Sequence, residues 1–399
     1  MSILINNMFR KIINTIHLLP IYWAVSGLFI VNNGDKILVS LILASLITKL
    51  LSHFLRKEKI LINFNLLIFS IFAVSIYASI KYFYNGYSSS EIRVLISTLL
   101  YATLSLPKKI KHETLIYTIT ISSIFILSQT INILELQGLT RKQLPLNAIP
   151  YANFTGLLSI ISLYLAYINK NKLLVSLSIL SFILLTINVI LVDTRGTWLA
   201  LIAVYITIIF LVFLKNKNWK VTLIFLSLFT TIAASSYPII ENRIDRSIHE
   251  VELLTEGNLN SSWGIRLQLW MVGYDIIKNN PSLVGLGQTA HIKIIQDMYE
   301  RGEVKKSLAK FDNKNFHNSI IDRTVKYGFL GLALYLSIIL IPFFYGINNL
   351  SSSSSPLLVI MPIFLFSAGL TYIPLSHPGT YFLYLFTSII CINKIKAEK

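Results

Sequence analysis

Three residues of this sequence place chemically capable side chains where a polar segment meets an apolar one. Arg195 lies in VDTRGTW between two apolar stretches, Arg266 begins a helical stretch in a long polar segment, and His317 precedes a long apolar run. Two planar guanidinium forks suit a diphosphate. A histidine at a helix start meets the positive end of the dipole, which keeps the ring neutral and able to accept a proton. Together these residues indicate transfer from a lipid diphosphate to a hydroxyl group.

Each of the three also has a purely structural interpretation. Arg195 is two residues from Asp193 and is able to pair with it to anchor a turn. Arg266 has the position of an ordinary arginine on an amphipathic helix, and His317 that of a helix cap, which Asn or Ser would fill almost as well. The chemical interpretation therefore depends on the three residues lying on one side of the molecule.

The composition places them in a membrane protein. The chain has 399 residues, of which 54% are hydrophobic and 13% charged, and its mean hydropathy is +0.66. Apolar runs of about 20 residues, long enough to cross a hydrocarbon layer of about 30 Å, recur along it. The sequence predicts an all-α polytopic membrane protein with about 12 transmembrane helices. The predicted spans are 12–31, 36–55, 60–82, 92–106, 114–134, 151–168, 173–193, 196–214, 221–238, 324–346, 356–374 and 380–393.

The distribution of positive charge predicts the orientation. The net charge is +17, but the basic residues fall in short clusters between spans, which is the pattern of cytoplasmic loops and not of a nucleic-acid surface. With the N-terminus in the cytoplasm, sixteen basic residues lie on the cytoplasmic side and three in the short outer loops. Both termini are expected inside, and Arg195, Arg266 and His317 on the outer face.

One connection is far longer than the rest and is expected to be a functional loop. The predicted organisation is helices 1–9 in residues 1–238, a large outer loop in 239–323, and helices 10–12 in 324–399. The loop is partly helical, because residues 263–281 and 291–308 each have helical periodicity and a glycine turn, GLGQ, separates them.

Several classes of site have no motif in the sequence. It contains no Walker loop, no CxxC and no HExxH, and its single cysteine, Cys391, forms no intrachain disulfide. The predicted spans hold few charges, such as Lys81 and Lys326 near span ends, where long side chains reach the interface. No acidic residue is expected to be buried in them, which disfavours a proton-coupled carrier.

Three ordered segments resemble the O-antigen ligase superfamily. They carry an Arg-Gly turn, an Arg–Trp helix that ends in Pro and Gly-x-Gly, and a His-Asn before Gly-x-x-Gly, and they read TRGTWLALIAVY, RLQLWMVGYDIIKNNPSLVGLGQ and FHNSIIDRTVKYGFLGLALYL. The resemblance covers residues 185–345 by motif and the whole chain by its number of spans.

The resemblance implies a role for individual residues. His317 matches the catalytic histidine that activates the acceptor hydroxyl, and Arg195 and Arg266 match arginines that bind the donor diphosphate. Three further residues lie in the same motifs and are candidates for secondary positions in the site: Trp270, Gly287 and Asn318. The resemblance implies no cofactor, neither ATP nor a metal ion, and it assigns no role to two further histidines, His249 and His291.

The resulting expectation is an O-antigen ligase of the Gram-negative inner membrane. Its donor would be undecaprenyl-diphosphate-linked O-antigen, its acceptor lipid A–core oligosaccharide, and its reaction would take place at the periplasmic face among membrane lipids. An O-antigen polymerase is the first alternative; the paired Arg-x10-Gly loops of that branch have one partial counterpart here, Arg246 and Gly257. A lipid-linked glycan flippase is the second, and it would favour repeated halves and a polar site at mid-membrane depth.

Overall fold

A computed structural model describes residues 2–31, 33–56, 64–107, 109–216, 230, 234, 237–310 and 315–399. Within these residues every regular element is a helix and none is a strand, which confirms the all-α expectation. The first part of the chain forms α1 (Ser2–Ala24), α2 (Gly27–Ile30), α3 (Gly34–Arg56), α4 (Leu66–Tyr84), α5 (Ser89–Leu100), η1 (Tyr101–Ser105), α6 (His112–Ile131), η2 (Asn132–Leu136), η3 (Arg141–Gln143), α7 (Ala148–Ile168), α8 (Lys172–Leu191) and α9 (Arg195–Asn216). The second part forms α11 (Tyr237–Thr255), α12 (Ser262–Asn279), α13 (Ala290–Glu300), α14 (Lys306–Ala309), α15 (Ser319–Ile347), α16 (Ser355–Gly369), η4 (Pro374–Ser376) and α17 (Pro378–Glu398).

Fewer helices qualify as membrane spans than the twelve expected. In the described part of the chain six helices are long and apolar enough to cross a membrane: α3, α4, α6 with η2, α7, α8 and α15. Two more, α9 and α16, are apolar but shorter. The predicted ninth span, 221–238, lies almost wholly outside the described residues. The predicted first span is broken after α1, because Val25 and Ser26 form a turn before α2.

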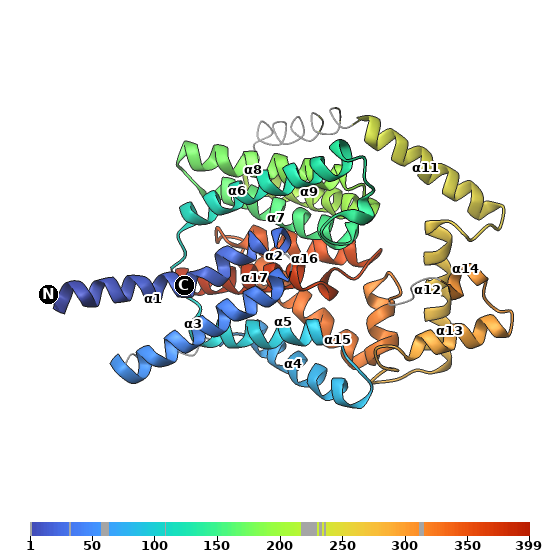
Figure 1. Ribbon diagram of the computed structural model, residues 1–399, viewed down its shortest axis with the longest axis horizontal. Helices are drawn as coiled ribbons and strands as arrows, with labels where there is room; N and C mark the ends of the chain where they lie inside the picture. Colours follow the sequence, from blue (N-terminus) through green and yellow to red (C-terminus); the bar gives the residue numbers. More distant parts are fainter. Residues whose placement is uncertain are drawn as a thin grey trace.

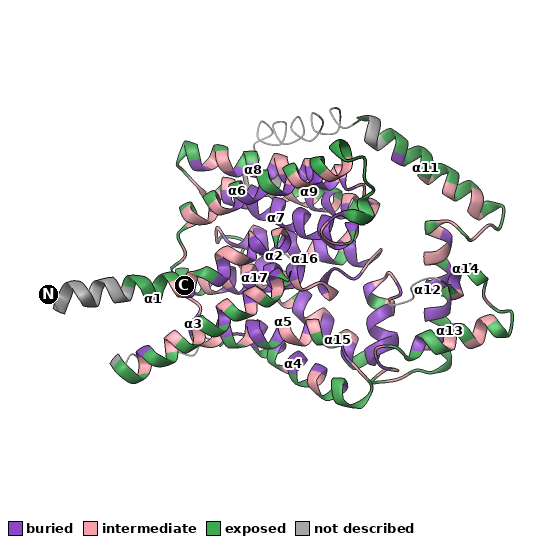
Figure 2. Cartoon of the chain, viewed as in Figure 1, coloured by how far each residue is buried: buried purple, intermediate pink, exposed green. Residues whose placement is uncertain are grey.

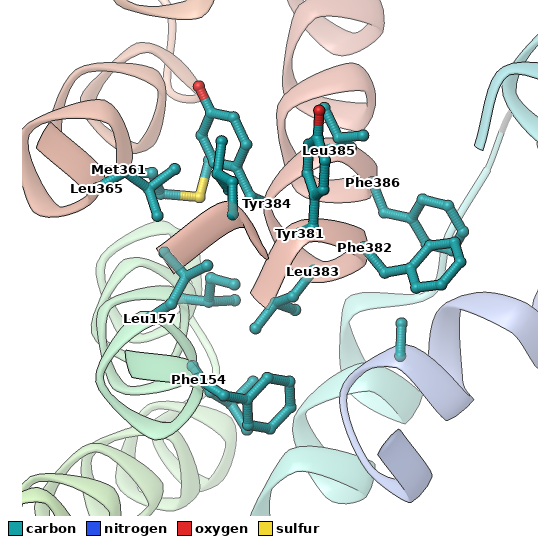
Figure 3. Close-up of a cluster of buried hydrophobic side chains, with 14 of the residues drawn as sticks. Phe154, Leu157, Met361, Leu365, Tyr381, Phe382, Leu383, Tyr384, Leu385 and Phe386 are labelled. Atoms are coloured by element: carbon teal, nitrogen blue, oxygen red, sulfur yellow. The ribbon is translucent and has the colours of Figure 1, made fainter. Parts of the chain in front are cut away.

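The centre of the helical bundle is α7, which packs against α6, α8, α9, α16 and α17. Figure 3 shows part of this core, where Phe154 and Leu157 of α7 meet Met361 and Leu365 of α16 and the aromatic-rich residues 381–386 of α17. Lipid is as apolar as these side chains, so the helices associate through close packing and not through removal of apolar surface from water. The result is a rigid bundle that supports the site at its end.

The loop helices gather at one end of the molecule. In Figure 1, α11 to α14 lie at the right, whereas α1 begins and α17 ends at the left. Helices α12, α13 and α14 share a small core around Leu269, Ile295 and Leu308, which also includes Phe316, just before α15, and Val325 of α15. The helix expected at 263–281 is confirmed as α12. The one expected at 291–308 is two helices, α13 and α14, and α11 is an additional helix that the sequence reading missed.

Helix α15 is discontinuous, whereas the sequence predicted an unbroken apolar span from residue 324. It begins at Ser319, and Gly328 within it has φ 68° and ψ −174°, which is not helical. The preceding loop fills the break: Phe329 and Leu330 N–H groups donate to the carbonyls of Ser282 (3.1 Å) and Leu283 (3.0 Å). An interruption leaves backbone N–H and C=O groups of a helix without hydrogen-bond partners in lipid, and here the loop supplies partners for the freed N–H groups.

Candidate functional site

His317 is the residue directly before the N-cap of α15. The cap itself is Asn318, whose side-chain oxygen accepts from the backbone N–H groups of Ile320 (2.9 Å) and Ile321 (3.2 Å). The alternative in which His317 caps the helix is therefore wrong. His317 has a left-handed backbone, with φ 50°, and its N–H donates to the Asn315 side chain at 3.1 Å. Such a conformation is uncommon outside glycine and persists only where surrounding contacts hold it.

Contacts on both sides of His317 hold it in place. Trp270 of α12 donates from Nε1 to the carbonyl of Phe316 at 3.1 Å, and Asn318 donates from Nδ2 to the carbonyl of Leu370 at 3.3 Å. The imidazole lies against the ring of Tyr372, with 5.6 Å between the ring centroids. Trp270 thus holds Phe316, the residue before the histidine, and Asn318, the residue after it, is held by its own bond to Leu370.

The imidazole is neutral at pH 7. Burial and, next, the charge of Arg266 lower the pKa of His317 from its usual 6.5 to about 4, while Asp322 acts in the opposite direction. A ring whose pKa lies below the ambient pH is unprotonated and has a lone pair that can accept a proton. The neutral state agrees with the sequence analysis, although the largest cause is burial and not the helix dipole named there.

Arg195 is the first residue of α9 and is covered by α11. Its Nη2 lies 2.7 Å from Oε1 of Glu250, its Nη1 donates to Ser247 Oγ at 2.9 Å, and its guanidinium lies over the ring of Trp263 at 5.8 Å. The alternative in which Arg195 pairs with Asp193 is wrong, because Glu250 is the carboxylate at its guanidinium. Its side chain is 12% exposed.

Arg266 lies on α12, within electrostatic range of both Arg195 and His317. In the part of the chain that the structure describes, no hydrogen bond or ion pair engages its guanidinium. Burial lowers the pKa of Arg266, and the charge of Arg195 lowers it further, while Glu250 raises it. The same guanidinium lowers the pKa of His317. Gly273 of α12 faces Ile321 of α15, and a Cβ at Gly273 would lie 2.3 Å from the Ile321 side chain. The absence of a side chain at Gly273 thus allows the two helices to approach closely. The structure thus brings Arg195, Arg266 and His317 together at one end of the bundle.

Three more arginines surround the turn before α9, and the sequence analysis gave them no role in a site. Arg243, Arg246 and Arg141 lie 3.0, 3.6 and 3.9 Å from the carboxylate of Asp193, and Arg141 also donates to its backbone carbonyl at 2.5 Å. The pKa of Arg243 is lowered to about 10, mainly by burial and also by the neighbouring arginines, while Asp193 acts in the opposite direction. The sequence feature that could have indicated them is the pair of arginines three positions apart in RIDR, because residues at this spacing lie on one side of a helix.

These residues form one field of positive charge, called the arginine cluster below: Arg141, Arg195, Arg243, Arg246 and Arg266. Among the described residues, ion pairs join it to two carboxylates, Asp193 and Glu250. Five guanidinium groups against two carboxylates leave an excess of positive charge next to a neutral histidine. Such an arrangement attracts a polyanion.

Gly287 belongs to the framework of the site and not to the arginine cluster. It has φ 99°, its N–H donates to the carbonyl of Lys326 at 2.8 Å, and a Cβ would lie 2.1 Å from the carbonyl oxygen of Asn85. Only glycine fits such a backbone and such a close approach. Gly287 therefore holds the GLGQ turn between α15 and the turn that follows α4.

Two ion pairs at the start of α15 correct the expected distribution of charge. Arg323 forms a bidentate, fully buried pair with Glu91 of α5 (2.8 and 3.1 Å), and Lys326 pairs with Asp322 at 2.8 Å. Lys326 was expected to reach the interface, as was Lys81, and both are buried. Acidic residues are thus buried in these helices, each with a basic partner, because an unpaired charge is costly in a membrane.

The two histidines without an assigned role lie outside the arginine cluster. His249 is an exposed residue of α11, 3.5 Å from Glu252, and His291 is buried on α13, where its ring packs against Phe316 at 5.0 Å. No group of three His, Cys, Asp or Glu side chains in the described residues is arranged to hold a metal ion.

Comparison with known proteins places this site within a family. Residues 180–336 match a family described as O-antigen ligase, and this segment includes Arg195, Arg266 and His317. An uncharacterized protein of Haemophilus influenzae is 30% identical over 163 residues, a stretch that covers 40% of this chain and 40% of that protein. The match over residues 180–336 confirms the resemblance of the three motifs to the O-antigen ligase superfamily.

Proposed function

We propose that this protein is an O-antigen ligase. It would transfer a glycan from undecaprenyl diphosphate to a hydroxyl group of lipid A–core oligosaccharide at the periplasmic face of a Gram-negative inner membrane. The observation that carries the proposal is Arg266, a partly buried guanidinium without a carboxylate partner in the described residues, whose charge acts on His317 and is itself acted on by Arg195. The match to the O-antigen ligase family over residues 180–336 supports the class of reaction.

The arginine cluster would bind the donor through its diphosphate. Planar guanidinium forks pair with phosphate oxygens. Arg195 begins α9, and its guanidinium lies over the ring of Trp263 in the first turn of α12, the helix that carries Arg266. The diphosphate is the leaving group and is already ionised, so it needs little proton donation but strong stabilisation of its charge. Positively charged groups placed before the reaction provide that stabilisation without reorganisation.

His317 would act as the general base. Its neutral ring accepts the proton of the acceptor hydroxyl as that oxygen attacks the anomeric carbon. The bond from this carbon to the diphosphate oxygen breaks, its electrons remain on the diphosphate, and the configuration is inverted. Arg266 lowers the pKa of His317. A diphosphate bound to Arg266 offsets that charge and raises the pKa, so donor binding would strengthen the base.

The test of this function is the lipopolysaccharide of a strain that lacks the protein. Electrophoresis would show loss of the O-antigen ladder, together with accumulation of free lipid-linked polymer, and the wild-type chain would restore the ladder. A band with a single repeat would instead indicate the polymerase. Loss of outward-facing donor would indicate a carrier, and an unchanged ladder with normal lipid-linked polymer would contradict the ligase proposal.

A further inference from the structure

The carboxylate of Glu250 occupies a position suited to a phosphate. Its Oε1 lies 2.7 Å from Nη2 of Arg195, and its Oε2 accepts from the backbone N–H of Trp263 at 3.2 Å. Trp263 is in the first turn of α12, where the helix leaves N–H groups free and its dipole favours an anion. This carboxylate thus contacts a guanidinium and a free N–H at a helix start, and both kinds of group commonly bind phosphate in proteins.

Helix α11 also restricts access to Arg195. Ser247 and Glu250, one turn apart on α11, take both terminal nitrogens of this guanidinium. The remaining nitrogen, Nε, is buried and has no hydrogen-bond partner among the described residues. An anion that binds the terminal nitrogens of Arg195 therefore has to displace Glu250 or Ser247.

The attachment of α11 is largely ionic. Ile244, Ile248 and Val251 on this helix are exposed, so they do not anchor it in an apolar core. Figure 2 shows α11 as mostly exposed, in contrast to the buried faces of α12. Its ion pairs with the site join Glu250 to Arg195, and Arg243 and Arg246 to Asp193. Hydrogen bonds of Ser247 with Arg195 and of Glu250 with the Trp263 N–H add to them. A diphosphate that enters the arginine cluster competes for the same charges that hold the helix.

We propose that Glu250 is an internal substitute for a donor phosphate. It occupies the diphosphate position at Arg195 while the site is empty, yields that position when the lipid diphosphate binds, and returns to Arg195 as the lipid diphosphate product leaves. This inference rests on the proposed function, because it assumes a diphosphate at the arginine cluster.

A structural role for Glu250 makes the opposite prediction. If its carboxylate only joins α11 to α9 and α12, its removal loosens the site and weakens binding. If it competes with the ligand, its removal frees Arg195 and also removes a negative charge beside the ligand, so binding becomes tighter. The direction of the change in affinity separates the two roles.

The experiment measures the affinity of undecaprenyl diphosphate for the purified full-length chain in lipid nanodiscs. Glu250→Gln should bind about threefold to tenfold more tightly than the wild type. Glu252→Gln is the matched control, because Glu252 lies on the same helix and its ion-pair partner is the exposed His249; its affinity should stay unchanged. In an Arg195→Ala background the gain from Glu250→Gln should disappear, because the two residues act through one contact.

A second variant protects the test against misfolding. Glu250→Asp keeps the charge but is one methylene shorter and cannot reach both Arg195 and the Trp263 N–H. The affinity of this variant for undecaprenyl diphosphate should therefore rise by less than that of Glu250→Gln. Equal or weaker binding by Glu250→Gln, while the wild type binds, would overturn the inference and leave the proposed function intact. A wild-type chain that does not bind undecaprenyl diphosphate would overturn both.

Discussion

At the scale of single residues, the site depends on how a histidine is kept neutral and in place. His317 is held by Trp270 and Asn318 through the residues on either side of it, and it does not cap the helix. Its role in the fold and its role in the proposed reaction are therefore separable by substitution.

We expect His317→Asn to fold like the wild type and to lose transfer by about 10²–10⁴-fold, the usual contribution of a general base. Asparagine also tolerates a left-handed backbone, and the cap on Asn318 remains. The measurements are glycan transfer by purified protein and thermal unfolding. Asn318→Ala is the comparison, since loss of the cap should cost about 1 kcal/mol of stability. Near wild-type transfer by His317→Asn would mean that the base lies elsewhere.

The pH dependence tests the link between Arg266 and His317. Protonation of His317 removes the base, so kcat/KM should fall on the acidic side as the pH approaches about 4. Because Arg266 lowers the pKa of His317, Arg266→Gln should raise that pKa and move the acidic limb to higher pH, in addition to weakening transfer. Arg301→Gln, a change at an exposed arginine paired with Glu303, should leave the limb in place. An acidic limb that stays in place in Arg266→Gln would exclude this coupling.

At the scale of elements, the break in α15 fixes the loop against the bundle. The carbonyls of Ser282 and Leu283 take the N–H groups after the break, and Leu286 and Gly287 donate to the carbonyls of Val325 and Lys326 before it. The turn that follows α12 is thereby joined to the helix that follows His317.

Gly328→Ala should therefore be strongly destabilising, by more than about 2 kcal/mol. Its backbone region is nearly restricted to glycine, and a Cβ would lie 2.3 Å from the carbonyl oxygen of Leu283. Gly302→Ala is the matched control: Gly302 also has a positive φ, 76°, but a Cβ there meets nothing within 4 Å. It should cost about 1 kcal/mol. Thermal unfolding in detergent measures both, and equal losses would show that the close packing at the break has no energetic weight.

At the scale of the whole molecule, the site and the chain termini lie at opposite ends (Figure 1). This arrangement agrees with a site on one side of the membrane and both termini on the other, and the charge asymmetry predicts that the termini are in the cytoplasm. The long loop is then predicted to lie outside, and its charges do not oppose this because long loops cross the membrane largely regardless of their charge.

Cysteine labelling tests this orientation. In a Cys391→Ala background, Lys293→Cys on α13 should react with an impermeant maleimide added to the periplasm, whereas Lys399→Cys should react only after the membrane is opened. Both positions are exposed, so access alone decides the result. The reverse pattern would place the site in the cytoplasm and contradict the proposed reaction.

The sequence by itself determined the class of the protein, and it supplied the candidate residues of the proposed reaction. Apolar periodicity and composition are local properties, so they indicated a helical membrane protein and located α12 around Arg266. These properties did not give the exact number of spans, since six helices among the described residues, and not twelve, have the length and apolarity required to cross a membrane. The motif residues were also readable, because a guanidinium or an imidazole has its chemistry wherever it stands in the chain.

Only the tertiary structure decided which partner each charge takes. Arg195 pairs with Glu250, 55 residues away, and not with nearby Asp193, because α11 returns over the start of α9. Arg243 and Arg246 take Asp193 instead, and the break in α15 exists because a distant loop supplies its hydrogen bonds. Ion pairs and backbone hydrogen bonds have short range, so they depend on where helix ends meet in space, and local periodicity carries no information about that meeting.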